Sequence, residues 1–204
     1  FSVLGYNDVE CLRLLLGGRT YFGQNDMWRL EGFGAYGFKD EKFKYGLSGK
    51  VLLSKKNRKI LFGGHRKDIE QTGASLTNSN DVLGRNRASS GLVTIGANDR
   101  LTNIELFTLG YEMEPAKNFI FRITGSHRTL KSASGTFSLS YYDKNGTIND
   151  VLKQSELELG INYTPGRKTS GYGVERKLIN QGDFPSFFLG YTFGLENVLK
   201  SDFD

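Results

Sequence analysis

The side chains that could carry chemistry are few in this chain of 204 residues. His65 and His127 are its two imidazole groups and its candidate general bases. Ser126 precedes His127, but neighbouring residues of a strand point to opposite faces, so these two cannot form a nucleophile and base pair. Because no credible triad can be assembled, the sequence predicts no catalytic residues and a protein that is not an enzyme.

Metal and cofactor motifs are also incomplete. Cys11 is the single cysteine, and together with two distant histidines it gives no zinc spacing. The segments 78–81 and 143–146 resemble fragments of calcium loops but lack the remaining acidic ligands, so turn formation explains them better. A GxGxxG string over 32–37 lies inside a predicted strand with no helix after it, which argues against dinucleotide binding. We therefore expect neither a metal nor a cofactor.

The charge and hydropathy patterns exclude two classes of protein. The net charge is +5, but the basic residues are spread along the chain among 22 acidic ones and form no basic helix, so we expect no nucleic-acid partner. No run of about 18 apolar residues exists, which excludes a helical membrane protein. The dense basic run 55–59 separates two predicted strands and indicates a solvated turn, with contact to lipid phosphates as the functional alternative.

Period-two alternation is the main structural signal, and a composition of 26 Gly, 15 Phe, 10 Tyr and only 3 Pro favours strands over helices. The alternation is clean in four segments, 43–53, 119–128, 155–163 and 187–194. Less regular candidates are 9–22, 28–39, 59–67, 102–112 and 137–142. Together these segments predict about nine strands in a single domain that covers residues 1–204.

The alternation also predicts two unlike faces. The apolar, lipid-facing candidates are Phe43, Tyr45, Leu47, Val51, Phe119, Phe121, Ile123, Leu157, Leu159, Ile161, Phe187, Leu189 and Tyr191. The polar, lumen-facing candidates are Lys44, Lys50, Arg122, Arg128, Glu156 and Glu158, joined by Arg13, Arg19, Arg29, Glu31 and Glu105. Mixed charges on one face favour cross-strand ion pairs that brace a wall, and a lined aqueous path is the alternative.

Strand length and connections favour a transmembrane barrel. Many candidates approach the roughly 9 to 11 residues that a tilted strand needs to cross the hydrocarbon layer, and aromatic residues collect near strand ends as in interfacial girdles. We expect short turns at one end of the strands and long loops, near 68–100, 143–154 and 166–184, at the other. The predicted fold is thus all-β, an antiparallel transmembrane outer-membrane β-barrel. Because nine strands is an odd number and the chain begins at Phe1, we expect a partial arc of a larger barrel.

Two blocks of sequence carry a resemblance to a known family. The first covers 9–20, 29–40 and 42–47, with the run Gly-Phe-Gly-Ala-Tyr-Gly-Phe at 32–38, and the second covers 184–194 and 200–204. These blocks resemble the large Bacteroidota outer-membrane proteins of the carboxypeptidase-regulatory-like, DUF5686 type. The resemblance implies an N-terminal β-sandwich module outside this chain, followed by a large barrel of which this chain is an internal portion. It implies no catalytic residues.

The functional expectation follows from the predicted fold. It is a non-enzymatic integral protein of the outer membrane of a Gram-negative bacterium, acting as a scaffold or accessory component of an envelope assembly complex. The expected partners are outer-membrane lipid, including lipopolysaccharide, and other outer-membrane barrel or surface proteins. An outer-membrane transporter or Omp85-like translocation or assembly pore is the first alternative. A soluble β-sandwich that binds glycans is the second.

Overall fold

The computed structural model describes residues 3–71, 82–83, 101–133, 137–142, 146–180, 182–196 and 198–202, which are almost entirely strands and their connections. The strands of the large sheet are β1 (Leu4–Asn7), β2 (Cys11–Arg19), β3 (Trp28–Gly37), β4 (Phe43–Ser54), β5 (Lys59–Gln71), β6 (Leu101–Ala116), β7 (Phe119–Ser132), β10 (Val151–Tyr163) and β13 (Phe187–Gly194). Two small hairpins pair β8 (Tyr141–Tyr142) with β9 (Ile148–Asn149), and β11 (Thr169–Ser170) with β12 (Lys177–Leu178). Two 3₁₀ turns complete the described elements, η1 (Lys56–Arg58) and η3 (Val198–Lys200).

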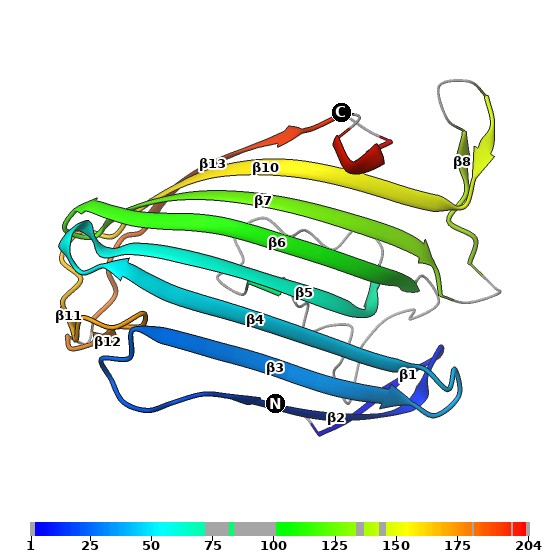
Figure 1. Ribbon diagram of the computed structural model, residues 1–204, viewed down its shortest axis with the longest axis horizontal. Coiled ribbons are helices and arrows are strands. Elements are labelled where there is room, and N and C mark those ends of the chain that lie inside the picture. The colour runs from blue at the N-terminus through cyan, green and yellow to red at the C-terminus, as the bar shows by residue number, and fades with distance from the viewer. Residues whose placement is uncertain are drawn as a thin grey trace.

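The large sheet is an antiparallel meander of nine strands, and the strands follow one another in chain order (Figure 1). Successive connections therefore alternate between two ends. We call these the β8 end, on the right in Figure 1, and the β11 end, on the left. The sheet is not closed, and β1 and β13 are its two edges. The all-β, antiparallel class predicted from the sequence is confirmed, whereas closure into a barrel is not shown.

The predicted strand 9–22 is wrong in its boundaries, because a turn occupies its first two residues and β2 ends at Arg19. The side-chain oxygen of Asn7 accepts hydrogen bonds from the backbone N–H of Val9, at 3.1 Å, and of Glu10, at 2.8 Å. An asparagine that binds the backbone two and three residues ahead stabilises a turn. The next residue, Cys11, has a φ of 54° and begins β2. The sheet consequently gains β1, which the alternation did not indicate.

The predicted strand 137–142 is also wrong, because only its last two residues are extended, and they form the small β8–β9 hairpin outside the large sheet. The number nine is nevertheless right, since β1 takes the place of this segment. Most other strands are longer than predicted, with 16 residues in β6 and 14 in β7. Strands of soluble proteins average nearer 5 or 6 residues.

The predicted separation of short turns from long loops is wrong. The short connection 8–10 and the long one 133–150 both lie at the β8 end, whereas 117–118 and the long 164–186 both lie at the β11 end. The predicted loop 143–154 is shortened because β10 begins at Val151. The loop near 68–100 begins later than predicted because β5 reaches Gln71, and 72–81 and 84–100 lie outside the described residues.

Buried apolar clusters in the described part of the chain lie at the two ends of the sheet. One consists of Val9, Ile69 and Leu101, and the other of Leu52, Ile60 and Val174. Within the same residues, no helix has the length and apolarity that a membrane span requires.

Candidate functional site: two unlike faces of one sheet

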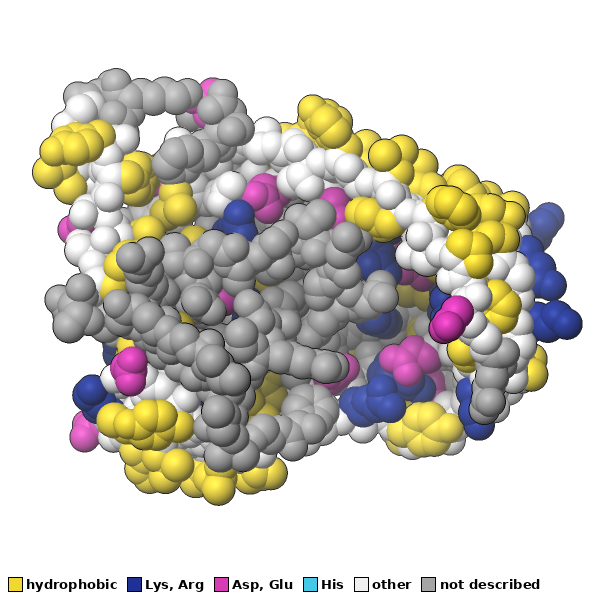
Figure 2. All heavy atoms as spheres, turned by 180° about the vertical axis from the view of Figure 1, so that it is seen from behind, with side chains coloured by type: hydrophobic (Ala, Val, Ile, Leu, Met, Phe, Trp, Pro, Cys, Tyr) yellow, Lys and Arg dark blue, Asp and Glu magenta, His cyan; other side chains and the backbone are white. Residues whose placement is uncertain are grey.

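The two faces of the large sheet differ in the side chains that dominate them. Cross-strand partners lie on the same face of a sheet, so the register assigns every strand residue to one side. We call the face with Arg13, Lys44 and Glu112 the inner face, because Figure 2 shows acidic and basic side chains within the hollow of the molecule. The opposite side, with Leu47, Leu109 and Leu189, is the outer face. Hydrophobic side chains lie along the outer rim in Figure 2.

The register places all thirteen apolar candidates on the outer face and all six polar candidates on the inner face. The additional inner-face candidates Arg13, Arg19, Arg29 and Glu31 also lie there. Glu105 does not. It pairs in register with Lys67, its carboxylate lies 3.4 Å from Nε2 of His65, and both side chains belong to the outer face. The irregular alternation of the predicted strand 102–112 explains this misassignment.

Burial is inverted relative to a water-soluble sheet. The inner-face side chains Arg13 and Lys44 are 1% and 3% exposed, whereas the outer-face side chains Leu47 and Leu189 are 59% and 68% exposed. Charged residues are almost never fully buried unless they are paired. The inner face must therefore supply partners for its charges.

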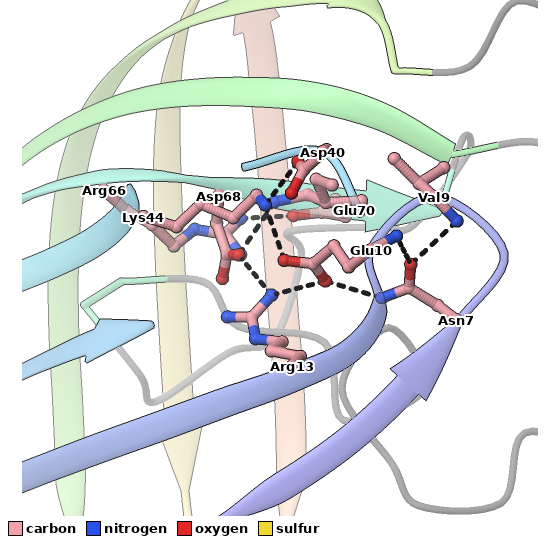
Figure 3. A network of polar contacts seen from close by, with 10 residues as sticks. Asn7, Val9, Glu10, Arg13, Asp40, Lys44, Arg66, Asp68 and Glu70 are labelled. Atoms are coloured by element: carbon pink, nitrogen blue, oxygen red, sulfur yellow. Dashed lines mark hydrogen bonds and ion pairs between the residues drawn. The ribbon is translucent and has the colours of Figure 1, made fainter. Parts of the chain in front are cut away.

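At the β8 end, the inner face holds a connected network of charges (Figure 3). Nη1 of Arg13 donates to Oδ1 of Asp68 at 2.7 Å and to Oε2 of Glu10 at 3.3 Å. Lys44 Nζ lies 2.6 Å from Oε1 of Glu10 and 2.6 Å from Oδ2 of Asp40. Asn7 donates to the second oxygen of Glu10 at 2.6 Å. Glu10 thus links β1, β2 and β4 through one buried carboxylate.

The neighbouring pair of Arg66 and Glu70 on β5 extends this network along the inner face (Figure 3). Glu10, which lies in the turn between β1 and β2, has a perturbed pKa. Burial raises the pKa of the Glu10 carboxyl, but the charges of Arg13 and Lys44 and the hydrogen bonds from Lys44 and Asn7 outweigh burial. Its pKa is therefore held below the ordinary value of 4.5. The carboxylate stays ionised, as its role between two cations requires.

At the β11 end, a segment of the β10–β13 connection crosses the sheet. Residues 172–176, which we call the strap, reach the connection between β2 and β3. The backbone N–H of Val174 donates to the carbonyl of Asp26 at 2.8 Å, and that of Tyr172 donates to Oδ1 of Asn25 at 3.0 Å. Val174 also packs into the buried cluster with Leu52 and Ile60. The strap therefore joins parts of the sheet that are far apart in strand order.

Ion pairs of the two residues that follow Val174 hold the strap. Glu175 pairs with Arg29 of β3, and Arg176 pairs with Glu114 of β6. Arg58 donates to the carbonyl of Val174 and lies 3.0 Å from Oε1 of Glu112. Arg122 of β7 bonds the second oxygen of Glu112 at 2.6 Å. This second network thus connects β3, β6 and β7 through the strap.

The remaining inner-face candidates follow the same pattern. Arg128 on β7 donates to Glu156 at 3.0 Å and to Gln154 at 2.9 Å, both on the adjacent β10. Lys50 and Glu158 share this face. The predicted charges thus form ion pairs of several kinds. Arg122 and Arg128 pair with neighbouring strands, whereas Arg13, Lys44 and Arg29 pair with a more distant strand, with turns or with the strap.

His127 has a serine partner that sequence reasoning missed. Its Nδ1 lies 2.8 Å from Oγ of Ser155, its cross-strand partner on β10, and Ser155 is 2% exposed. The same hydroxyl donates to the carbonyl of Val198 at 2.8 Å, so its proton faces away from the imidazole. The Ser155 hydroxyl is therefore placed to link β10 to η3 rather than to act as a nucleophile. The strand register, which the sequence did not reveal, brings the two residues together.

Among the described residues, no three His, Cys, Asp or Glu side chains lie close enough together to hold a metal ion. Comparison of the chain with protein-family models, curated proteins and solved structures gives no match. The resemblance to the DUF5686 type therefore stays a prediction, and a functional assignment depends on the geometry of the two faces.

Proposed function

We propose that this chain forms part of the wall of an integral outer-membrane β-barrel, with the outer face toward lipid and the inner face toward the lumen. Its role in this proposal is that of a non-enzymatic scaffold or accessory component of an envelope assembly complex. The support comes from the outer face, where large apolar side chains are exposed on strands long enough to cross a bilayer.

The observation that carries the proposal is the oblique course of the apolar band across the strands. One row of outer-face partners is apolar throughout, namely Trp28, Val51, Leu61, Tyr111, Ile123, Leu159 and Tyr191. A row nearer the β8 end is without polar side chains from β2 to β4 and polar from β5 to β10. Its members are Leu16, Gly34, Tyr45, Lys67, Glu105, Thr129 and Lys153. The boundary of the band therefore moves toward the β11 end from one strand to the next.

The slope of that boundary matches strands that are tilted in a membrane. On β4 the band includes Tyr45 and extends beyond it to Phe43, but on β10 it begins only at Leu157, four residues from Lys153 of the Tyr45 row. Over four strands this is a shift of about 1 to 1.5 residues per strand. With a rise of about 3.3 Å per residue and about 4.8 Å between strands, the shift corresponds to a tilt of about 35–45°. Transmembrane barrels tilt their strands by about 35–45°.

The exposure of apolar side chains on the outer face argues against the alternative of a soluble β-sandwich. A sandwich packs the apolar faces of two sheets against each other and leaves polar faces in water. Here large apolar side chains of the outer face are exposed, with Phe43 at 64% and Leu16 at 71%. The polar face is the buried one.

The paired charges favour a braced wall over the alternative of a transporter or pore. Arg13, Arg29 and Arg128 each have a carboxylate partner on the inner face. An aqueous path selective for one charge sign would need a surplus of that sign along its lining. These pairs instead join β2 to β5, β3 to the strap and β7 to β10, and so brace the wall.

Membrane extraction tests this function. The chain, expressed with an export signal, should sediment with the outer membrane, resist extraction by urea at alkaline pH and dissolve in mild detergent. If the wall closes into a barrel, the dissolved protein should also migrate faster on an electrophoresis gel before heating than after it. A chain that stays monodisperse in buffer without detergent would falsify the proposal.

A further inference from the structure

The outer face contains a hollow of about 320 Å³ near the β11 end. Its floor includes Gly49 and Gly63, which are partners in the β4–β5 register, and its walls are Trp28, Leu30, Leu61 and Leu109. All of these belong to the outer face. Paired glycines lower the surface of the sheet because they place no side chain on it. Ligand pockets begin at about 300 Å³, so the hollow is large enough for a flexible hydrocarbon chain.

Basic side chains lie beside the mouth of this hollow. The basic run 55–59 forms the β4–β5 turn, and its members take different directions. Arg58 turns inward to Glu112. Lys59 lies on the outer face, two residues from the wall residue Leu61, because Ile60 between them is buried. Lys56 is exposed in η1. Figure 2 shows basic side chains gathered at the edge of the molecule where the β11-end turns lie.

Aromatic residues border the same mouth. Trp28, a wall residue of the hollow, packs against Phe22, with ring centroids 5.3 Å apart. Tryptophan and tyrosine sit at the level of lipid head groups, where one end of the side chain is apolar and the other is wet. Along the outer face, the apolar hollow is therefore bordered by Trp28 and lies beside exposed cations.

We propose that this hollow and the lysines beside it form a binding site for one anionic phospholipid. An acyl chain lies over Gly49 and Gly63, and the phosphate lies against Lys56 and Lys59. The inference rests on the proposed membrane location and specifies which lipid class this patch of the outer face selects. Charge complementarity distinguishes this occupant from a second copy of the chain, whose corresponding turn would bring the same cations.

Trp28, the single tryptophan of this chain, is a built-in probe of the site because it forms one wall. The chain is reconstituted in phosphatidylcholine vesicles that contain a minority of either brominated phosphatidylglycerol or brominated phosphatidylcholine. Bromine on an acyl chain quenches tryptophan on contact. We expect the anionic probe to quench at a several-fold lower mole fraction than the zwitterionic one. Trp28→Phe supplies the background.

Two sets of variants separate the two parts of the site. Lys56→Gln with Lys59→Gln should make the two brominated lipids equally effective, whereas Lys42→Gln, an exposed lysine at the β8 end, should preserve the preference. Gly63→Val should weaken quenching by both lipids because its side chain enters the hollow. Gly18→Val is the matched control, since a Cβ at this outer-face glycine meets no atom within 4 Å.

Each other outcome has a defined meaning. Two results would contradict the lipid site but not the membrane function. One is equal quenching of the unsubstituted chain by both lipids, and the other is an unchanged preference after removal of the two lysines. Protection of Trp28 from both lipids in membrane-inserted particles of two chains overturns the lipid site in favour of a second copy. Absence of quenching in a chain that urea washes off the vesicles contradicts the membrane function itself. The lysines are exposed, so their variants test the site even if Gly63→Val fails to fold.

Discussion

On β4, Lys44 and Leu47 lie three residues apart and on opposite faces of the same strand. Lys44 is 3% exposed and Leu47 is 59% exposed. Hydrophobic burial in water drives the opposite arrangement. This contrast is what the proposed lipid contact of the outer face would produce, while the inner face is stabilised by ion pairs and hydrogen bonds. Substitutions and titrations on the two faces test that contrast, beginning with the largest expected effect.

The largest effect is expected for Arg13→Ala on the inner face. This change removes the cation that lies between Glu10 and Asp68, so that buried Asp68 loses the cation it pairs with while Glu10 keeps only Lys44. Loss of one partner of a buried pair costs about 3–5 kcal/mol. The free energy of unfolding, measured by urea titration in detergent, should fall by that order. The double variant Arg13→Met with Asp68→Leu should lose less than Arg13→Ala, and an equal or larger loss would contradict the pairing.

A second test places the same charge on either face of β13. Leu189 lies on the outer face and Thr192 on the inner face, and both are exposed. Arginine at the lipid face near the bilayer midplane costs about 2–4 kcal/mol. In lipid vesicles, Leu189→Arg should therefore destabilise the protein by that amount and Thr192→Arg by far less. In water, exposed substitutions cost about 0.5 kcal/mol or less, so equal small effects would show that the outer face is hydrated.

A third test uses the titration of Glu10. Its pKa is lower in the folded chain than the ordinary value of 4.5, so the ionised form stabilises the fold above that pH. This stability should be lost as the pH falls through 4.5 and then through the lower folded pKa. The urea midpoint should therefore drop between pH 5 and pH 3. In Glu10→Gln this part of the drop should be absent, and an identical profile would exclude Glu10 as its source.

The smallest effect is expected for Arg19→Gln in the second network. Arg19 and Arg29 share the carboxylate of Glu175, but the Arg19 side chain is 53% exposed and that of Arg29 is 5% exposed. Exposed pairs contribute about 0–1 kcal/mol, because water and salt screen them. Arg19→Gln should change the unfolding free energy by less than Arg29→Gln does. The reverse order would show that the strap is anchored from the exposed side.

Much of the large sheet can be predicted from local sequence. Segments such as 155–163 and 187–194 alternate cleanly, and the structure places each of them in the sheet with the predicted facing. The failures come from residues that act through side-chain geometry. Asn7 creates a turn inside an apolar run, and Glu105 lies where the alternation is weak. A pattern of hydrophobicity contains neither kind of information.

The sequence by itself determined which side chains share a face, because alternation in a strand is a property of the backbone over two residues. It also determined the two unlike surfaces that result. Only the tertiary structure decided which charges meet. Arg13 and Asp68 are separated by 55 residues, and Arg29 and Glu175 by 146. Such pairs depend on strand order, register and the course of the strap, which follow from the packing of the whole sheet.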